Sequence, residues 1–348
     1  MVKILYGLCS IGIGHAIRAK EIIGYLEQQG HEVFVITSYK AYAYLSKYVS
    51  KVYNIEGAEL IFKNNNILSC KTFWRNITKL NPNNYAKLAE VKKVIEEFKP
   101  ELVISDWETV STYFARNLKL PLLSIDNQAF LRYGNYKVPF KYWCQYILAR
   151  CVLRFLVRKS DYSLVIKFPE MQMEERPNII SCLPLVKKEI KESHPKRGKH
   201  IIVYDSTKTH NKLMKILKDI KENFIVYGYD RVGEEGNMTF KMFDDSEAYI
   251  KDLFSCKAII TNAGFTLLSE AIYLGKPILC IPIKKHFEQT LNSIYIKEHE
   301  LGETYNRLNV KNIKKFLKNC EKYRKHRMNY ETDLFIKLDG LIKEAVKK

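Results

Sequence analysis

The sequence lacks several features that would assign it to a class of protein at once. No apolar run reaches the roughly 18 residues of a membrane-spanning helix, and no short repeat or low-complexity tract occurs. The eight cysteines are scattered, without a CxxC pair or a cluster of cysteine and histidine. We therefore expect buried thiols in a reducing cytosol rather than disulfides or zinc ligands. Because a strand pattern at Lys3–Tyr6 follows Met1 almost directly, we also expect no cleaved leader and a cytoplasmic protein.

Length and composition favour two folded domains of ordinary size. The chain has 348 residues, and 47% of them are hydrophobic, which is enough to form real cores. Its charge is lopsided, with 57 Lys and Arg residues against 38 Asp and Glu residues and a net charge of +19. Such a balance favours anionic partners, which include nucleic acid, anionic lipid and phosphorylated substrates, without choosing among them.

Predicted strands and helices alternate along the chain, which indicates an α/β fold with parallel sheets. The first half predicts strands and helices at Lys3–Tyr6, Ala16–Gln29, Glu32–Thr37, Ala41–Tyr48, Ala86–Phe98, Leu102–Ser105, Thr109–Asn117 and Pro121–Ile125. The second half predicts them at His200–Asp205, Thr209–Lys221, Phe224–Tyr227, Ser246–Phe254, Ala258–Thr261, His286–His299, Val310–Cys320 and Arg324–Val346. The polar residues 186–199 predict a linker between a domain of residues 1–185 and one of residues 200–348.

The stretch Thr261–Pro282 carries the most specific pattern. It predicts a strand, a tight turn of small residues at Asn262–Gly264, a helix from Phe265 to Leu274 and a second strand. A small-residue turn that opens a helix can bind an anion, because free N–H groups and the positive end of the helix dipole point out of it. Glu270 lies about a turn and a half further on, where it suits a sugar diol. The pattern is consistent with a nucleotide-diphosphate site and equally with an ordinary βαβ unit that has a glycine turn.

The loop after the first strand contains Gly12, Gly14 and His15, and Arg18 follows in the helix. Glycines let the backbone approach a ligand, and the dipole at a helix start disfavours an imidazolium. A neutral imidazole can accept a proton, so we favour a general base or a sugar-binding role for His15 over a capping or core histidine. A dinucleotide-binding fingerprint does not fit, because the third glycine and the acid after the second strand are both missing.

Two further strand ends in the first half are polar. Asp106 closes the strand at Leu102–Ser105, and it can either orient His15 or cap the next helix. Asp126, Asn127 and Gln128 follow the next strand, where they suit acceptor hydroxyls or form a turn.

Polar strand ends recur in the second half. Ser206 and Thr207 can hold phosphate through hydroxyls and backbone amides, although a helix N-cap at Thr207 or Thr209 is the favoured interpretation. Glu288 and Gln289 open a later helix with groups suited to sugar hydroxyls, with a solvated helix start as the alternative.

The segment Phe140–Arg158 predicts a helix with a basic stripe. Arg150, Arg154 and Arg158 recur at i, i+4 and i+8, and aromatic residues such as Trp143 surround them. Such a helix is suited to lie on an anionic membrane. The favoured alternative is a mostly buried helix whose arginine stems reach solvent.

Taken together, Gly12–Arg18, Thr261–Pro282 and the sequence ITSYKAYAYLSKY at Ile36–Tyr48 resemble glycosyltransferases of the GT-B fold. The likeness is to the branch that contains MurG, which completes lipid II, and within it to a mostly archaeal group of poorly characterised glycosyltransferases. It covers nearly the whole chain. It implies two Rossmann-like domains that face a cleft, an N-terminal acceptor domain and a C-terminal donor domain, with the last helix free to pack back on the first domain.

The resemblance also implies roles for residues of both halves. His15 and Asp106 would be catalytic, and the donor and acceptor sets follow. The donor nucleotide-sugar would contact Asn262, Gly264, Phe265, Thr266, Glu270, Glu288, Gln289, Ser206 and Thr207. The acceptor side would contain Gly12, Gly14, Arg18, Asp126, Asn127 and Gln128. The chain departs from the family in having no glycine in Asp205-Ser206-Thr207 and in carrying Thr290 after Glu288-Gln289, where the family has a second glutamine.

The implied reaction is an inverting single displacement that needs no metal ion or other cofactor. A hydroxyl acceptor, lipid-linked or part of a cell-envelope glycan, attacks the sugar of a UDP-sugar, and His15 or a neighbouring carboxylate takes its proton. The diphosphate leaves toward the helix at Gly264. Residues 140–158 would then hold the protein at the inner face of the membrane.

Two other functions are open. The Gly-x-Gly-His-x-x-Arg pattern also resembles a nucleotide-sugar hydrolase of the pseudaminic acid pathway, in which water replaces the acceptor. A basic, non-catalytic or nucleic-acid-binding protein is suggested by the charge, but no recognisable nucleic-acid motif supports it.

Overall fold

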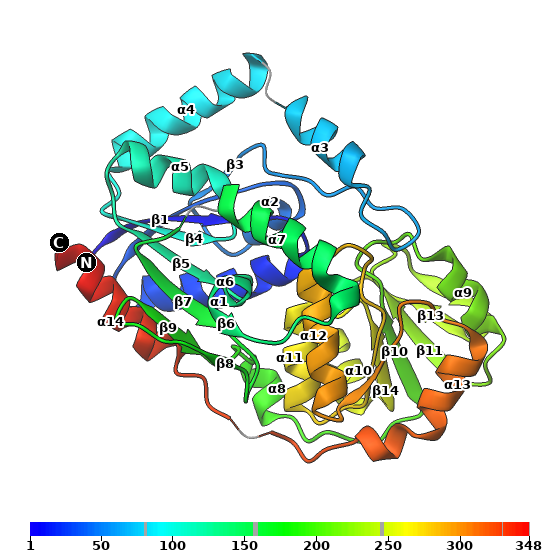
Figure 1. Cartoon of the computed structure of the whole chain (residues 1–348). Helices are drawn as coiled ribbons and strands as arrows, with labels where there is room; N and C mark the ends of the chain where they lie inside the picture. The colour runs from blue at the N-terminus through cyan, green and yellow to red at the C-terminus, as the bar shows by residue number, and fades with distance from the viewer. Residues whose placement is uncertain (80–81, 156–158, 244–246, 329, 348) are drawn as a thin grey trace. The chain divides into compact units, whose positions relative to one another are not determined.

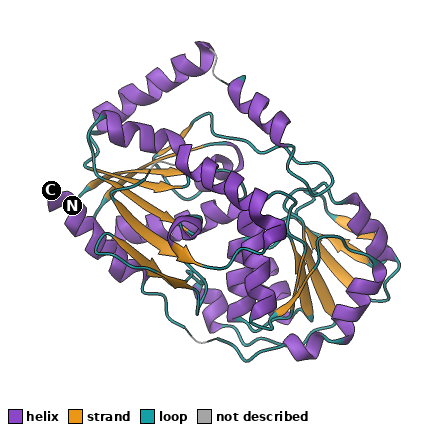
Figure 2. Cartoon of the chain, in the orientation of Figure 1, coloured by secondary structure: helices purple, strands orange, loops and turns teal. Residues whose placement is uncertain are grey.

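The computed structural model describes residues 1–79, 82–155, 159–243, 247–328 and 330–347. The chain forms two units, each described here by itself. Unit 1 contains Met1–Leu60, Ser69–Leu185 and Glu331–Lys348, and unit 2 contains Ile61–Leu68 and Val186–Tyr330. Neither unit is a continuous stretch of chain. Helices flank the sheet of each unit (Figure 2).

Unit 1 is built on a parallel sheet of seven strands in the order β3-β2-β1-β4-β5-β7-β9. Apart from the edge strand β3, its strands are largely buried runs rich in valine, isoleucine and leucine, as expected for a parallel sheet covered on both faces. The strands are β1 (Lys3–Leu8), β2 (Glu32–Thr37), β3 (Val52–Asn54), β4 (Leu102–Asp106), β5 (Leu122–Asp126), β7 (Tyr162–Ile166) and β9 (Ile179–Cys182). A small antiparallel pair joins β6 (Gly134–Asn135) to β8 (Gln172–Met173).

The helices of unit 1 include one from the far end of the chain. Those of its first segments are α1 (Ile13–Gln28), α2 (Tyr39–Leu45), α3 (Ser69–Ile77), α4 (Pro82–Phe98), α5 (Thr109–Asn117), α6 (Phe130–Tyr133) and α7 (Trp143–Phe155). The last helix, α14 (Leu334–Lys347), packs against β4, β5, β7 and β9 (Figure 1). Phe335 of α14 stacks on Tyr25 of α1, with ring centroids 4.2 Å apart, and the Tyr25 hydroxyl donates to Asp339 at 2.6 Å.

Unit 2 repeats the architecture with a second sheet in the order β12-β13-β11-β10-β14-β15-β16, parallel except for the pair β12–β13. The strands are β10 (His200–Tyr204), β11 (Asn223–Tyr227), β12 (Gly233–Glu235), β13 (Met238–Phe240), β14 (Ala258–Thr261), β15 (Ile278–Cys280) and β16 (Gly302–Thr304). The helices are α8 (Lys188–Glu192), α9 (Asn211–Lys218), α10 (Glu247–Ser255), α11 (Phe265–Tyr273), α12 (Phe287–Glu298) and α13 (Val310–Lys318).

Three expectations about the chain path need correction. Residues 186–199 were predicted to be a linker, but they belong to unit 2 and contain α8 (Lys188–Glu192), whose Ile190 is buried. The helix predicted at Arg324–Val346 begins only at Leu334. Residues 61–68 were included in the predicted domain of residues 1–185, but they pack as part of unit 2.

The cysteines are all free, as predicted, but three of them are not buried. Cys70 lies on α3, and Cys144 and Cys151 lie on α7, two helices with large exposed faces. Within the part of the chain that the structure describes, every helix is too short or too polar to cross a membrane.

Candidate functional site

The first candidate cluster lies in unit 1, where β1 and β4 end side by side. Leu8 and Asp106 are partners in the parallel register, so the loop after β1 starts next to the Asp106 carboxylate. Gly12 has a φ of 93° and precedes α1, whose first turn contains Gly14 and His15. This left-handed conformation suits glycine and turns the chain directly from the strand end into the helix.

His15, Asp106 and Arg18 form one hydrogen-bonded group. The His15 Nδ1 atom lies 2.8 Å from Asp106 Oδ1. Arg18 Nη2 donates to both Asp106 oxygens at 2.7 Å, and Arg18 Nη1 donates to the Asn127 side-chain oxygen at 3.1 Å. Asp106 has no exposed surface. The sequence left open whether Asp106 orients His15 or caps a helix. Glu108 caps α5 instead, by accepting from the Val110 and Ser111 amides.

The positive charge beside Asp106 stabilises its buried carboxylate in the ionised form. Burial alone would raise the pKa of Asp106, but the charges of Arg18 and His15 outweigh burial and hold that pKa below its ordinary value. Asp126, which ends the neighbouring strand β5, has the opposite balance. Its burial, together with the nearby charge of Asp106, raises the pKa of Asp126 to about 6. Two carboxyls of one cluster therefore differ in protonation in weakly acidic solution.

Of the polar residues at the end of β5, Asn127 and Gln128 contact the same group, whereas Asp126 forms a turn. Asp126 Oδ1 accepts from the Ala129 amide at 2.5 Å, which is the turn considered from the sequence. Asn127 binds Arg18, and the Gln128 side-chain amide lies 3.2 Å from His15 Nε2. Of the six residues predicted for the acceptor side, Arg18, Asn127 and Gln128 thus join the hydrogen-bonded group of His15 and Asp106. Asp126 lies close enough to feel the charge of Asp106, and Gly12 and Gly14 precede His15 at the start of α1.

The second candidate cluster lies in unit 2, where β14 ends and α11 begins. Ala263 has a φ of 66°, a strained conformation for a residue with a side chain, and its carbonyl accepts from the Asn292 side-chain nitrogen at 3.0 Å. Gly264 is the N-cap residue of α11, and no side chain forms a capping hydrogen bond there. The first turn of the helix contains no acidic residue. Phe265 and Thr266 form that first turn. Such an end has the polarity that attracts an anion.

The loop after β10 is held by its own Asp205 and by side chains from the loops after β11 and β14. The Asp205 carboxylate accepts from the Thr207 amide at 3.0 Å, from the Thr207 hydroxyl at 2.8 Å and from the Tyr229 hydroxyl at 2.9 Å. The Ser206 amide donates to the Asn262 side chain at 2.9 Å. The helix N-cap predicted at Thr207 or Thr209 is wrong, because α9 begins at Asn211 with His210 as its N-cap residue. The hydroxyls of Thr207 and Thr209 instead bond to each other at 3.0 Å.

Glu270 is buried within unit 2 and already has two polar neighbours. The Tyr249 hydroxyl donates to one of its oxygens at 3.3 Å, and Lys187 Nζ lies 3.7 Å from the other. Burial raises the pKa of Glu270 above its ordinary value. Neither Tyr249 nor Lys187 was singled out from the sequence, because nothing in the local patterns links them to Glu270.

Glu288 and Gln289 lie in the first turn of α12, next to the end of β15. Gln289 is buried, and its side-chain oxygen accepts from the Ile283 amide at 3.0 Å. Glu288 is partly exposed. The alternative of a solvated helix start therefore does not describe Gln289.

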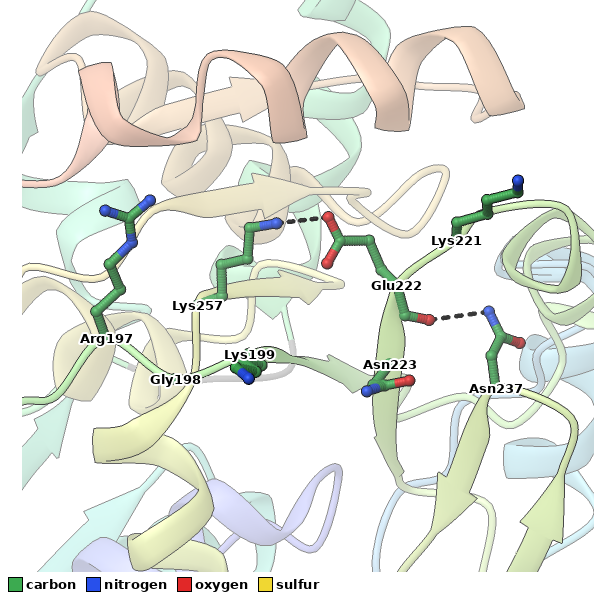
Figure 3. A pocket seen from close by; sticks show the side chains of 8 residues that line it. All are labelled: Arg197, Gly198, Lys199, Lys221, Glu222, Asn223, Asn237 and Lys257. Carbon is green, nitrogen blue, oxygen red and sulfur yellow. Dashed lines mark hydrogen bonds and ion pairs between the residues drawn. The ribbon is translucent and has the colours of Figure 1, made fainter.

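A hollow of about 510 Å³ opens at the amino ends of strands β10, β11 and β14 of this sheet (Figure 3). It is lined by charged side chains, which are Arg197, Lys199, Lys221, Glu222 and Lys257. Glu222 is bonded to Lys257 at 2.5 Å, as the dashed line in Figure 3 shows. The hollow is separate from the second cluster, because that cluster lies at the carboxyl ends of the strands. Ligands of open parallel sheets bind at those carboxyl ends.

The helix α7 presents an apolar face to solvent. Phe140 just before it is 90% exposed, and Trp143, Ile147 and Leu148 are about half exposed. The interpretation of a mostly buried helix is therefore wrong. Arg154 is exposed, Arg150 donates to the Leu131 carbonyl at 3.3 Å, and Arg158 lies outside the described residues.

Comparison with known proteins assigns the chain to a family. The matching family model is described as "Glycosyl transferase family 1" and spans residues 2–321. The chain belongs to glycosyl transferase family 1. An uncharacterised glycosyltransferase of Methanosarcina acetivorans is 24% identical to this glycosyltransferase over 336 residues, which cover 86% of this chain and 85% of the relative. The prediction of a glycosyltransferase similar to an archaeal group is confirmed.

Solved structures show the fold. Acinetobacter baumannii MurG matches this glycosyltransferase with a TM-score of 0.56 and 14% identity, over 99% of this chain and 100% of MurG. Phytolacca americana UGT2, solved with UDP-2fluoro-glucose and pterostilbene, matches with a TM-score of 0.61 and 14% identity, over 99% of this chain and 94% of that one. The predicted GT-B fold of two Rossmann-like domains is confirmed, and so is the enzyme class.

Proposed function

We propose that the enzyme transfers a sugar from a nucleotide-diphosphate sugar, UDP-linked, to a hydroxyl acceptor with inversion and without a metal ion. The observation that carries this proposal is the 2.8 Å contact between His15 Nδ1 and Asp106 at the end of the first sheet's strands. A carboxylate can only accept, so Nδ1 holds the proton and Nε2 keeps its lone pair. That lone pair now faces the Gln128 amide at 3.2 Å, and an acceptor hydroxyl would take its place.

In the proposed reaction, every bond change and proton transfer is accounted for by the two substrates and residues of this chain. The acceptor oxygen forms a bond to the anomeric carbon, and the bond from that carbon to the diphosphate oxygen breaks. The acceptor proton passes to His15 Nε2, and the nucleoside diphosphate leaves with the electron pair. Asp106 stabilises the imidazolium that forms, while Arg18 keeps Asp106 ionised.

For the donor, we propose the N-terminus of α11 as the diphosphate site, with Gly264, Phe265 and Thr266 supplying backbone amides. Glu270 would accept from ribose hydroxyls, and Glu288 and Gln289 would contact the sugar. The Phytolacca americana UGT2 structure, a complex with UDP-2fluoro-glucose, supports a nucleotide-diphosphate donor for this fold.

The test is a product analysis of the full-length enzyme with a panel of UDP- and dTDP-sugars and hydroxyl acceptors, with and without EDTA. We expect a glycoside of inverted configuration, at a rate that EDTA does not change. His15→Gln should lower kcat by about 100-fold or more, since general bases contribute that much, and the exposed His194→Gln is the matched control. Release of free sugar and nucleotide with no transfer product would establish the hydrolase instead.

We also propose that the exposed face of α7 binds an anionic membrane and brings the enzyme to a lipid-linked acceptor. The residues that support this are the exposed Phe140, Trp143, Ile147 and Leu148, which lie at helical spacing near Arg150 and Arg154. Apolar side chains with arginines at their border match the layer between lipid headgroups and acyl chains.

A further inference from the structure

A short tongue of chain, residues 61–68, leaves the N-terminal half and packs into unit 2. It is a tight hairpin, in which Phe62 pairs with Ile67 and the Lys63 amide donates to the Asn66 carbonyl at 2.9 Å. Its tip is fixed to the chain after β15. The Lys284 amide donates to the Asn65 carbonyl at 3.0 Å, and the Ile67 amide donates to the Lys284 carbonyl at 3.2 Å.

Asn65, at the tip of this tongue, contacts three loops of the second cluster. It is 3% exposed and has a φ of 55°. Its amide donates to the Thr209 hydroxyl at 3.0 Å, in the loop after β10. Its side-chain oxygen accepts from Asn262 at 3.1 Å, just before α11, and its side-chain nitrogen lies 3.4 Å from the carbonyls of Ile281 and Pro282.

The hydrogen bonds continue from the tongue to the glycine-free loop after β10. Asn262 donates to Asn65 and accepts from the Ser206 amide at 2.9 Å, so one side chain joins the two segments. Asn262 is thereby held two residues before Gly264, the N-cap residue of α11. A loop without glycine cannot approach a phosphate as closely as a glycine-rich one, and here its position is set by the tongue.

Two polar atoms beside these contacts are unsatisfied. The Asn66 side-chain oxygen and the Thr261 hydroxyl are buried and have no hydrogen-bond partner among residues 1–79, 82–155, 159–243, 247–328 and 330–347. Buried polar groups of this kind are rare and need a partner, such as a ligand or an ordered water. Asn66 and Thr261 are the chain neighbours of Asn65 and Asn262, so this unused hydrogen-bonding capacity is available to a polar ligand or an ordered water.

We propose that the tongue Ile61–Leu68 is part of the donor site and that Asn65 is a positioning residue for a nucleoside diphosphate. This inference rests on the proposed function. Asn65 acts through Asn262 and Ser206, whose loop it holds next to the open end of α11. The N-terminal half thus contributes to donor binding through a segment of eight residues.

A matched pair of glycine variants tests this. Asn64 and Asn65 both adopt the left-handed conformation, with φ of 49° and 55°, so glycine preserves the backbone at either position. Asn64 is exposed, whereas Asn65 makes the contacts above. For Asn65→Gly we expect UDP binding by calorimetry to weaken, and the donor KM to rise, by about tenfold, as for one or two lost hydrogen bonds. The acceptor KM should not change, and Asn64→Gly should behave like the wild type.

Hydrogen exchange of the unmodified enzyme gives a second measurement that does not depend on a variant folding. Adding UDP should protect the amides of residues 61–68 and leave those of β12 and β13 unchanged. Equal UDP affinity in Asn65→Gly and Asn64→Gly, or a tongue that UDP leaves unprotected, would overturn the role of the tongue while the donor assignment stands. Wild-type enzyme that binds neither UDP nor dTDP would overturn the donor assignment itself.

Discussion

The buried carboxyl of Asp126 should make unit 1 less stable as the solution becomes neutral. Asp126 is 2% exposed and lies at the end of β5, close to the ionised Asp106. These surroundings raise its pKa from an ordinary value of 3.8 to about 6. The perturbation that tests this is Asp126→Asn, because asparagine keeps a side-chain oxygen for the Ala129 amide and cannot ionise.

The sign and size of the effect follow from proton linkage. The folded chain holds the Asp126 proton more tightly than the unfolded chain does, so the free energy of unfolding falls as pH rises from about 4 to about 6. The two values differ by about two pKa units, and one unit corresponds to about 1.4 kcal/mol. At pH 7.5 the wild type should therefore carry a penalty of about 3 kcal/mol that is nearly absent at pH 4.0. Asp126→Asn should remove that penalty.

The assay is urea unfolding followed by tryptophan fluorescence at both pH values. All three tryptophans, Trp74, Trp107 and Trp143, lie in unit 1, so the signal reports the unit that contains Asp126. The difference in unfolding free energy between variant and wild type should move in favour of the variant by about 3 kcal/mol from pH 4.0 to pH 7.5. A difference that is the same at both pH values would refute the reasoning.

Two other predictions concern a buried lysine and the exposed helix. Lys276 is 1% exposed and donates to the carbonyls of Lys196, Phe254 and Cys256 at 2.6–2.9 Å. Lys276→Met should cost unit 2 about 3 kcal/mol, because three buried carbonyls lose a charged donor, and circular dichroism during urea unfolding would measure it; an unchanged midpoint would contradict this. Replacing both Arg150 and Arg154 with Glu should abolish co-sedimentation with anionic liposomes and leave the circular dichroism spectrum unchanged, whereas equal binding would remove α7 from membrane contact.

Much of the fold could be predicted because its signals are local. The strands Glu32–Thr37 and Ala258–Thr261 and the helix Thr109–Asn117 have the bounds that their sequences indicate. A buried parallel strand is a short apolar run between polar turns, and such a run can be recognised without knowing its neighbours. The strands β7 and β9, at Tyr162–Ile166 and Ile179–Cys182, were not predicted, although both are short apolar runs of this kind.

The two candidate clusters differ in how many of their contacts could be predicted from the sequence. The contact between His15 and Asp106 was a hypothesis from the sequence, because strand ends of one parallel sheet meet at the same edge. The capping role of Glu108 was missed, since Asp106 and Glu108 both precede the helix and only the backbone geometry chooses between them. The bond between Asn65 and Asn262 joins residues 197 positions apart, and no periodic pattern predicts it. Three consecutive asparagines at 64–66 do indicate a left-handed turn, which is the one local signal for the tongue.

The return of α14 to the first sheet has a consequence for synthesis. Domains usually fold in the order in which they leave the ribosome. Here the sheet of unit 1 is complete once Cys182 has emerged, but the helix that covers β4, β5, β7 and β9 is made only about 160 residues later. At a translation rate of about 5–20 residues per second, that apolar face of the sheet stays uncovered for roughly 10–30 s before α14 is made. The first half to be translated is therefore the last to be finished, and a nascent chain is most exposed to aggregation while unit 2 is being made.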